Sequence, residues 1–197
     1  MVRSFRGGGI ALCSTSMSPV DRVHPGADME RFVKEQMAFV GIDDADVALI
    51  RGTAPLIVAH EEALTAALYD HFLAFPSTAQ FFLGEEGSPD RTRIERRKHS
   101  LARWLRETAE VVIEKGFVYY LLGVALAHSH REHGPGGKIP LHFMVSAMSL
   151  TQTALAGIFA QELGAEEAGA ASVAWNKILL VQLSVFMLAY VPPRPVL

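Results

Sequence analysis

Three histidines lie within residues 128–133, and histidine is the side chain most often used to bind metals or move protons near neutral pH. His128 continues an apolar stripe on one face of a helix, at 3.6 residues per turn, after Phe117, Leu121 and Val124. An unpartnered imidazole beside hydrocarbon is costly. His128 therefore either has a buried hydrogen-bond partner or gives a lone pair to a metal, and the stripe alone leaves both readings open.

The spacing His-x-His-x-acid-His over residues 128–133 is also reminiscent of the metal motif of metallo-β-lactamase-type hydrolases. Such a site needs a strand-to-loop context and a later bridging aspartate, yet no aspartate follows Asp90. On a helix, His130 and His133 point about 200° and about 140° away from His128, so the three cannot meet at one ion. We interpret His130 and His133 as solvated residues near a helix C-terminus, where positive charge is favourable.

Helix signals recur along the chain, whereas hairpin turns and period-two alternation are nearly absent. Asp43 is a predicted N-cap, Pro55 should kink or divide the helix that follows, and Ser88-Pro89 is a predicted helix start. The expected helices span about 28–39, 43–76, 77–83, 88–116, 117–133, 139–163 and 166–191. These elements predict one all-α domain of about eight helices over residues 26–192, with a disordered arm at 1–25 and a tail at 193–197.

The composition narrows the classes of function. The 197 residues are half apolar, with a net charge of −3 and a pI near 6.2, which gives no field for nucleic acid. The one cysteine excludes an internal disulfide and a cysteine-rich metal site, and a reducing cytoplasm is the simplest location. Residues 139–160 carry no charged side chain, but polar residues interrupt them, so we predict buried or subunit-interface helices and no membrane span.

A large all-α core of this kind is typical of folds that pack around a flat apolar cofactor. A haem iron bound by a single proximal histidine needs little more from the sequence. His128 is the candidate ligand in that reading, and a hydrogen-bonded core histidine is the alternative.

Several motifs in register resemble one family, the protoglobins, and also the globin domains of globin-coupled sensors. The stretch Val124-Ala-Leu-Ala-His128-Ser-His-Arg, followed by a short loop and Ile139-Pro-Leu-His-Phe-Met-Val, resembles their proximal helix and the start of the next helix. Another match is to their distal helix and the turn after it, which the residues Leu68-Tyr69-Asp-His-Phe72, Pro76 and Phe81-Phe82 resemble. Two further matches are Arg97-Lys98-His-Ser-Leu101-Ala-Arg-Trp104, for the helix over the haem, and Trp175-Asn-Lys with Val181-Gln-Leu, for the last helix. The resemblance covers about residues 28–191.

This resemblance implies a globin-like fold with an extra N-terminal helix and a bound haem b (iron protoporphyrin IX). His128 would be the axial iron ligand, with its second ring nitrogen bonded to a carbonyl one turn earlier. Tyr69 would lie over the distal face and donate a hydrogen bond to dioxygen, although a core tyrosine bonded to a carbonyl is the alternative. The remaining expected cofactor contacts are Leu101, Phe72, Phe82, Val124 and Met144.

The sequence departs from the family pattern at two places. Leu68 stands where a bulky aromatic commonly precedes the distal tyrosine. Ser100 stands where a basic residue is expected near a haem propionate, and Arg97 or Lys98 is a possible substitute. His71 and His99 are expected on outer faces, away from the iron.

The expected function is therefore that of a single-domain globin that binds diatomic gases (O₂, CO or NO), for sensing or scavenging, with no output module before Leu197. The resemblance further implies a homodimer formed through the last two long helices. One alternative is a haem enzyme acting on NO, nitrite or peroxide at the same site. A second is a helical interaction module without a cofactor.

Overall fold

The computed structural model describes residues 28–110 and 115–191. The arm predicted for residues 1–25 and the tail predicted for 193–197 lie outside these residues. Every regular element within them is a helix, so the all-α prediction is confirmed. The same residues contain one isolated β-bridge, between Leu83 and Pro89.

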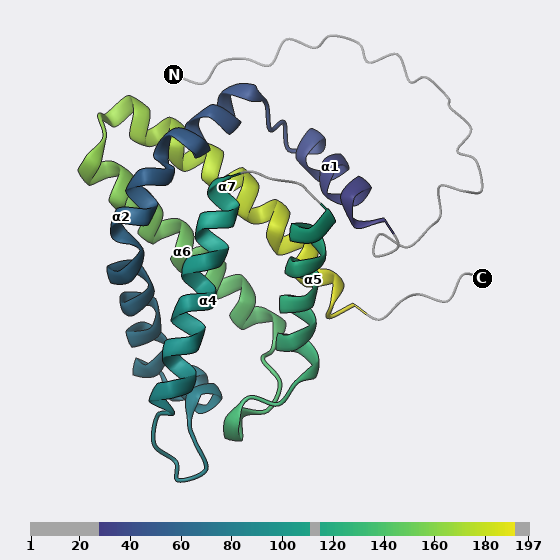
Figure 1. Cartoon of the computed structure of the whole chain (residues 1–197), viewed down its shortest axis with the longest axis vertical. Coiled ribbons are helices and arrows are strands. Elements are labelled where there is room, and N and C mark those ends of the chain that lie inside the picture. Colours follow the sequence, from purple (N-terminus) through teal and green to yellow (C-terminus); the bar gives the residue numbers. More distant parts are fainter. Residues whose placement is uncertain (1–27, 111–114, 192–197) are drawn as a thin grey trace, which may run out of the picture.

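Seven α-helices follow one another in the described residues, close to the eight expected (Figure 1). They are α1 (Met29–Phe39), α2 (Asp44–Ala74), α3 (Pro76–Ala79), α4 (Arg91–Ala109), α5 (Lys115–His130), α6 (Leu141–Glu162) and α7 (Ala165–Leu188). Two short 3-10 helices, η3 (Gln80–Phe82) and η4 (Gly134–Gly136), lie in the connections.

The long helix α2 begins where the sequence predicts. The carboxylate of Asp43 accepts a hydrogen bond from the Asp46 amide at 2.9 Å, and the Asp46 carboxylate accepts one from the Asp43 amide at 3.2 Å. Pro55 lies inside the helix, and Figure 1 shows α2 bent but continuous, so the proline does not divide it. Ile50 and Ile57, on either side of the proline, are both fully buried, and this packing offsets the roughly 3 kcal/mol that an internal proline costs.

The start and end of α4 differ from the prediction. Its N-cap is Asp90, whose carboxylate accepts a hydrogen bond from the Arg93 amide at 2.9 Å. Ser88 and Pro89 belong to the preceding loop, because Pro89 pairs with Leu83 in the β-bridge. The helix ends at Ala109 and does not continue to residue 116.

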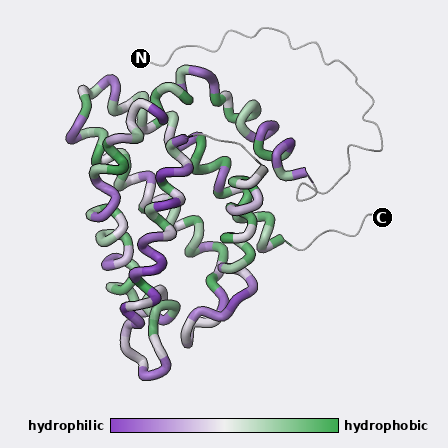
Figure 2. The backbone as a smooth tube through the Cα atoms, viewed as in Figure 1, coloured by the Kyte–Doolittle hydropathy of each residue, from purple (hydrophilic) through white to green (hydrophobic). Residues whose placement is uncertain are grey.

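The C-terminal helix α7 is buried along most of its length and forms a hairpin with α6 (Figures 1 and 2). Trp175, which is 1% exposed, donates its indole N–H to the hydroxyl of Thr53 on α2 at 2.8 Å. Gln182, also buried, accepts a hydrogen bond from the indole of Trp104 on α4 at 2.6 Å. These two bonds fix the position of α7 relative to α2 and α4.

Within the described residues, α6 and α7 are the two helices long and apolar enough to cross a membrane by length and composition. The most apolar window of α7 is 56% buried inside the protein, as expected for a core helix, whereas that of α6 is 22% buried. The outer side of α6 exposes Ser146, Ser149 and Thr153, so polar side chains interrupt its apolar surface.

The packing of α6 on α7 can be tested with two matched substitutions. Phe159 on α6 is 0% exposed and packs against Trp175 with 6.3 Å between ring centroids. Phe159→Ala should lower the free energy of unfolding by about 3–5 kcal/mol, because it leaves a cavity in the core. Phe39→Ala, at a ring that is 84% exposed, should change it by less than about 0.5 kcal/mol. Equal effects in denaturant unfolding would contradict this core.

Candidate functional site

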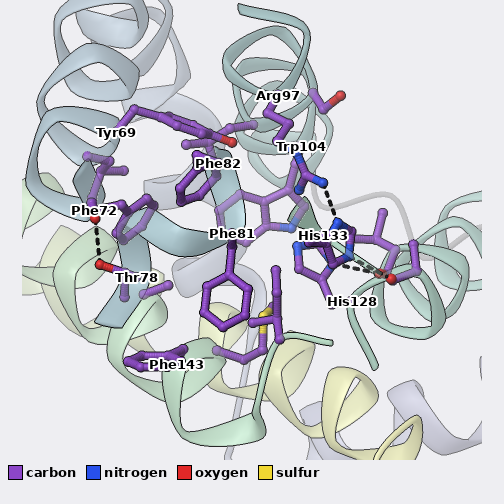
Figure 3. A pocket seen from close by; sticks show the side chains of 18 of the residues that line it. Tyr69, Phe72, Thr78, Phe81, Phe82, Arg97, Trp104, His128, His133 and Phe143 are labelled. Atoms are coloured by element: carbon purple, nitrogen blue, oxygen red, sulfur yellow. Dashed lines mark hydrogen bonds between the residues drawn. The ribbon is translucent and has the colours of Figure 1, made fainter. Parts of the chain in front are cut away.

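His128 lies in the last turn of α5, and its ring has two different environments (Figure 3). Nδ1 is 2.7 Å from the carbonyl oxygen of Val124, one turn earlier, which is the hydrogen bond that the family resemblance implies. Because a carbonyl oxygen only accepts, Nδ1 must carry the hydrogen and Nε2 must keep its lone pair. Nε2 points away from α5 and is the atom available to a ligand.

Burial keeps this imidazole neutral. It lowers the pKa of His128 to about 4, a shift that the hydrogen bond to Val124 opposes and that nearby Arg97 and His133 reinforce. At neutral pH the ring is therefore uncharged and its lone pair is free. A neutral imidazole with one nitrogen fixed by a carbonyl is the form in which histidine binds metals.

His128 faces a cavity of about 750 Å³, which lies between two parts of the hydrophobic core. The volume is in the upper part of the roughly 300–1,000 Å³ range typical of pockets for small molecules and cofactors. Seven residues expected at the site come together on its walls, from α2, η3, α4, α5 and α6: His128, Tyr69, Leu101, Phe72, Phe82, Val124 and Met144.

One wall of the cavity is aromatic (Figure 3). The ring of Tyr69 meets Phe72 and Phe82 edge to face, with centroid distances of 5.7 and 5.5 Å. Phe72 and Phe82 stack on each other at 6.2 Å. Burial raises the pKa of the Tyr69 phenol, although nearby Arg97 opposes the shift, so the hydroxyl remains protonated and can donate.

The described residues give neither the Tyr69 hydroxyl nor Nε2 of His128 a hydrogen-bond partner. In the same residues, every fully buried polar side-chain atom does have one. Both atoms must therefore border open space, and the space that both residues line is the cavity. The carbonyl-bonded tyrosine considered as an alternative for Tyr69 is not found.

An arginine and a histidine close one side of the cavity. Arg97 on α4 donates through Nη2 to Nδ1 of His133 at 2.6 Å, and Nε2 of His133 donates to the carbonyl of Ala127 at 2.9 Å. The guanidinium carbon of Arg97 also lies 5.9 Å from the ring centroid of Phe82. Lys98, the other expected basic residue, instead pairs with Glu95 at 2.9 Å and does not line the cavity.

His133 is therefore not the solvated residue that the sequence predicts, since it is 7% exposed, whereas His130 is exposed. The difference comes from the loop after α5, which turns back and brings His133 against the end of that helix. Its ring lies 5.8 Å from the ring of His128. Because α5 remains helical through His130, the strand-to-loop context of a dinuclear hydrolase is not present there.

Two glycines allow this loop to approach so closely. Gly134 has φ of +54°, and a Cβ there would lie 2.6 Å from the carbonyl oxygen of Leu83. A Cβ on Gly136 would lie within 2.7 Å of the ring of Phe81. The loop thus packs directly on η3, beneath the aromatic wall.

Trp104 also lines the cavity, although it is not among the expected cofactor contacts. It follows Arg97 by seven residues and Leu101 by three, so all three share one face of α4. This helical spacing is the sequence signal that places Trp104 at the cavity. The indole N–H is bonded to Gln182, so Trp104 presents only its ring to the cavity. His71 and His99 are exposed and lie outside the cavity lining, as expected.

The family model described as Protoglobin matches residues 29–194. Among solved structures, the globin domain of the Geobacter sulfurreducens globin-coupled sensor is 23% identical with a TM-score of 0.67, and the likeness covers 80% of this chain and 96% of that one. No curated protein matches.

The globin domain of E. coli DosC is similar in two crystal forms. The ferrous form is 18% identical with a TM-score of 0.60, covering 79% of this chain and 97% of that one. The ferric form is 17% identical with a TM-score of 0.60, covering 80% and 98%. These likenesses confirm the predicted globin-like fold. With the family model matched over nearly all of the described residues, the chain belongs to the protoglobin family.

Proposed function

We propose that this chain binds haem b (iron protoporphyrin IX) through His128 and uses it to bind diatomic gases, for sensing or scavenging. The observation that carries the proposal is the neutral His128 ring, whose Nδ1 is fixed by Val124 and whose Nε2 opens into an apolar cavity of about 750 Å³. A cavity with one strong nitrogen donor and otherwise mostly apolar and aromatic walls fits a flat, apolar metal macrocycle.

Different residues around the cavity would hold the iron, the propionates and the macrocycle of the haem. His128 would hold the iron, and the hydrogen bond to Val124 sets its tautomer and ring plane. Arg97 would hold a propionate, because its planar guanidinium lies at the cavity wall and carboxylates are its preferred partners. Phe72, Phe82 and Leu101 would cover the macrocycle and exclude water.

Haem, when bound, supplies an iron with an open coordination position for a small gas molecule. On the side facing that position, Tyr69 would supply a hydrogen-bond donor, because its hydroxyl is protonated, unpartnered and at the cavity surface. A donor favours dioxygen, which becomes polar on binding, over CO, which remains nearly neutral. Tyr69 therefore sets the preference between gases.

The two alternative functions have less support. A haem enzyme needs a free acid–base pair near the reacting ligand, and the Arg97–His133 pair has both nitrogens of its imidazole engaged, one by Arg97 and one by Ala127. A cofactor-free helical interaction module does not account for an open cavity beside a free histidine lone pair. A reducing cytoplasm stays our prediction for the location, because the sequence has one cysteine.

We also propose that the chain forms a homodimer through α6 and α7. Val173, Leu180 and Met187 are 55%, 44% and 41% exposed, and they follow one another at intervals of seven along α7. Residues seven apart share one helix face, and an exposed apolar stripe of this kind suits packing against a second helix. Val145, 44% exposed on α6, adds to the apolar surface of this hairpin.

Haem binding is tested by the absorption spectrum of the purified protein, oxidised, reduced and treated with CO. We expect a Soret band that shifts on reduction and on CO addition. In His128→Ala the band should be lost or strongly weakened, because the imidazole nitrogen that would hold the iron is removed. The matched control is His130→Ala, at an exposed histidine two residues away, which should keep the wild-type spectrum. A colourless chain that does not take up added hemin would refute the proposal.

The role of Tyr69 is tested by the rates at which the two gases are released. Tyr69→Phe should speed O₂ release by about tenfold or more, since a hydrogen bond to a charged acceptor contributes about 1.5–3 kcal/mol. CO release should change little. Tyr120→Phe, which alters another tyrosine of the cavity wall, should leave both rates near wild type. Equal effects of Tyr69→Phe on O₂ and CO would rule out a distal donor.

The dimer is tested by sedimentation or light scattering. Leu180→Glu places a charge in the exposed stripe of α7 and should convert a dimer to a monomer. Val58→Glu, at a residue that is 48% exposed on α2, is the control and should remain dimeric. A monomeric wild-type protein would contradict the proposed dimer.

A further inference from the structure

Tyr190 lies just beyond the end of α7 and reaches back to the loop that follows α5. Its hydroxyl donates to the carbonyl oxygen of Ile139 at 3.0 Å. Burial raises the pKa of this phenol to about 12, so it is a permanent donor at physiological pH. In Figure 1 the yellow end of α7 lies beside the lower half of α5.

Ile139 is in turn bonded to the candidate ligand residue. Its amide donates to the carbonyl oxygen of His128 at 3.0 Å. Ile139 is 8% exposed, lines the cavity and belongs to the same core cluster as Tyr69. Two hydrogen bonds and the backbone of one residue, Ile139, therefore connect the main chain of His128 to the C-terminal end of α7.

The main-chain carbonyl of His128 depends on the Ile139 amide for its hydrogen bond, because it lies at the end of α5. The last four carbonyls of a helix have no partner within the helix, and His128 is in the last turn of α5. Residues of the returning loop supply the partners: Ile139 bonds to His128, and His133 bonds to Ala127. If Ile139 moved, the last turn of α5 would lose a hydrogen bond at the residue that carries the ligand nitrogen.

We infer that Tyr190 is a positioning residue for His128, and that the two hydrogen bonds through Ile139 couple the depth of His128 in the cavity to the C-terminal end of α7. This inference rests on the proposed function. If ligand binding in the cavity moved His128, the movement would pass through the His128 carbonyl to Ile139 and then to Tyr190. Because such coupling is reciprocal, a change at the end of α7 also changes the hold of His128 on its ligand.

The same geometry explains why α7 is the helix that responds. Its N-terminal and central parts are fixed by the bonds of Trp175 to Thr53 and of Gln182 to Trp104. After α7 ends at Leu188, the next two amides bond only within the closing turn, to Phe186 and Met187. Within the described residues, the hydroxyl of Tyr190 thus makes the side-chain hydrogen bond that joins this end to the α5 side of the cavity.

The experiment compares Tyr190→Phe with Tyr119→Phe in the full chain. Tyr190→Phe removes one oxygen atom and keeps the ring, whereas Tyr119 is a 40% exposed tyrosine on α5 and serves as the control. In the cofactor-free protein, hydrogen exchange at the Ile139 amide should become about fivefold faster in Tyr190→Phe, the factor expected for one lost hydrogen bond. The control should exchange like wild type, and circular dichroism checks that both variants are folded.

In the haem-loaded protein, two further readouts apply. The iron–histidine stretching frequency, measured by resonance Raman on the ferrous form, should be lower in Tyr190→Phe than in wild type and in the control. CO binding should alter hydrogen exchange at residues 186–191 of wild type and of the control, and this response should be lost in Tyr190→Phe.

The results separate the two claims. An unchanged stretching frequency and an unchanged CO response in Tyr190→Phe, in a protein that shows a Soret band, would overturn the coupling and leave haem binding intact. Absence of a Soret band in all three proteins would overturn the proposed function, and the inference with it. A wild-type rate of exchange at Ile139 in cofactor-free Tyr190→Phe would by itself refute the positioning role.

Discussion

The imidazole of His128 can face an apolar cavity because one of its two nitrogens is satisfied inside its own helix. The bond from Nδ1 to the carbonyl of Val124 satisfies one of the two ring nitrogens, and it fixes the hydrogen on that side. The other nitrogen is then free, neutral and directed. The rest of the site is arranged around this constraint: aromatic side chains opposite, an arginine at the edge, and a loop that returns to hold the helix end.

The cavity also explains how the core is organised. Buried side chains fall into two clusters, and the residues that pack against both, Phe72, Leu101 and Met144, are residues of the cavity wall. An open volume of this size removes van der Waals contacts, so the elements around it depend on the polar links between them. Arg97 with His133, and Tyr190 with Ile139, are two of these links. Any ligand that fills the space in the folded state stabilises that state by mass action.

The sequence predicts the features that depend on local period and spacing. His128 continues a helical stripe, Tyr69 and Phe72 are one turn apart, and all are found on the cavity wall. The features that it misses depend on where the chain returns in space. Nothing local to His133 indicates that a glycine-rich loop brings it against Ala127, or that Tyr190, 51 residues after Ile139, reaches that loop. The same reason explains Pro55, whose cost is offset by core packing that the local sequence does not reveal.

α7 connects the parts of the molecule that carry these functions. One side of the helix is buried and bonded to α2 and α4, and the opposite side exposes the stripe of Val173, Leu180 and Met187. Met187 lies within the final turn of α7, and Tyr190 follows it by one turn. The element that Tyr190 ties to the cavity is therefore the same element that would face a second copy of the chain. A displacement that begins at His128 can reach that surface without passing through the fixed middle of α7, because the link through Ile139 meets Tyr190, just beyond the last turn of the helix.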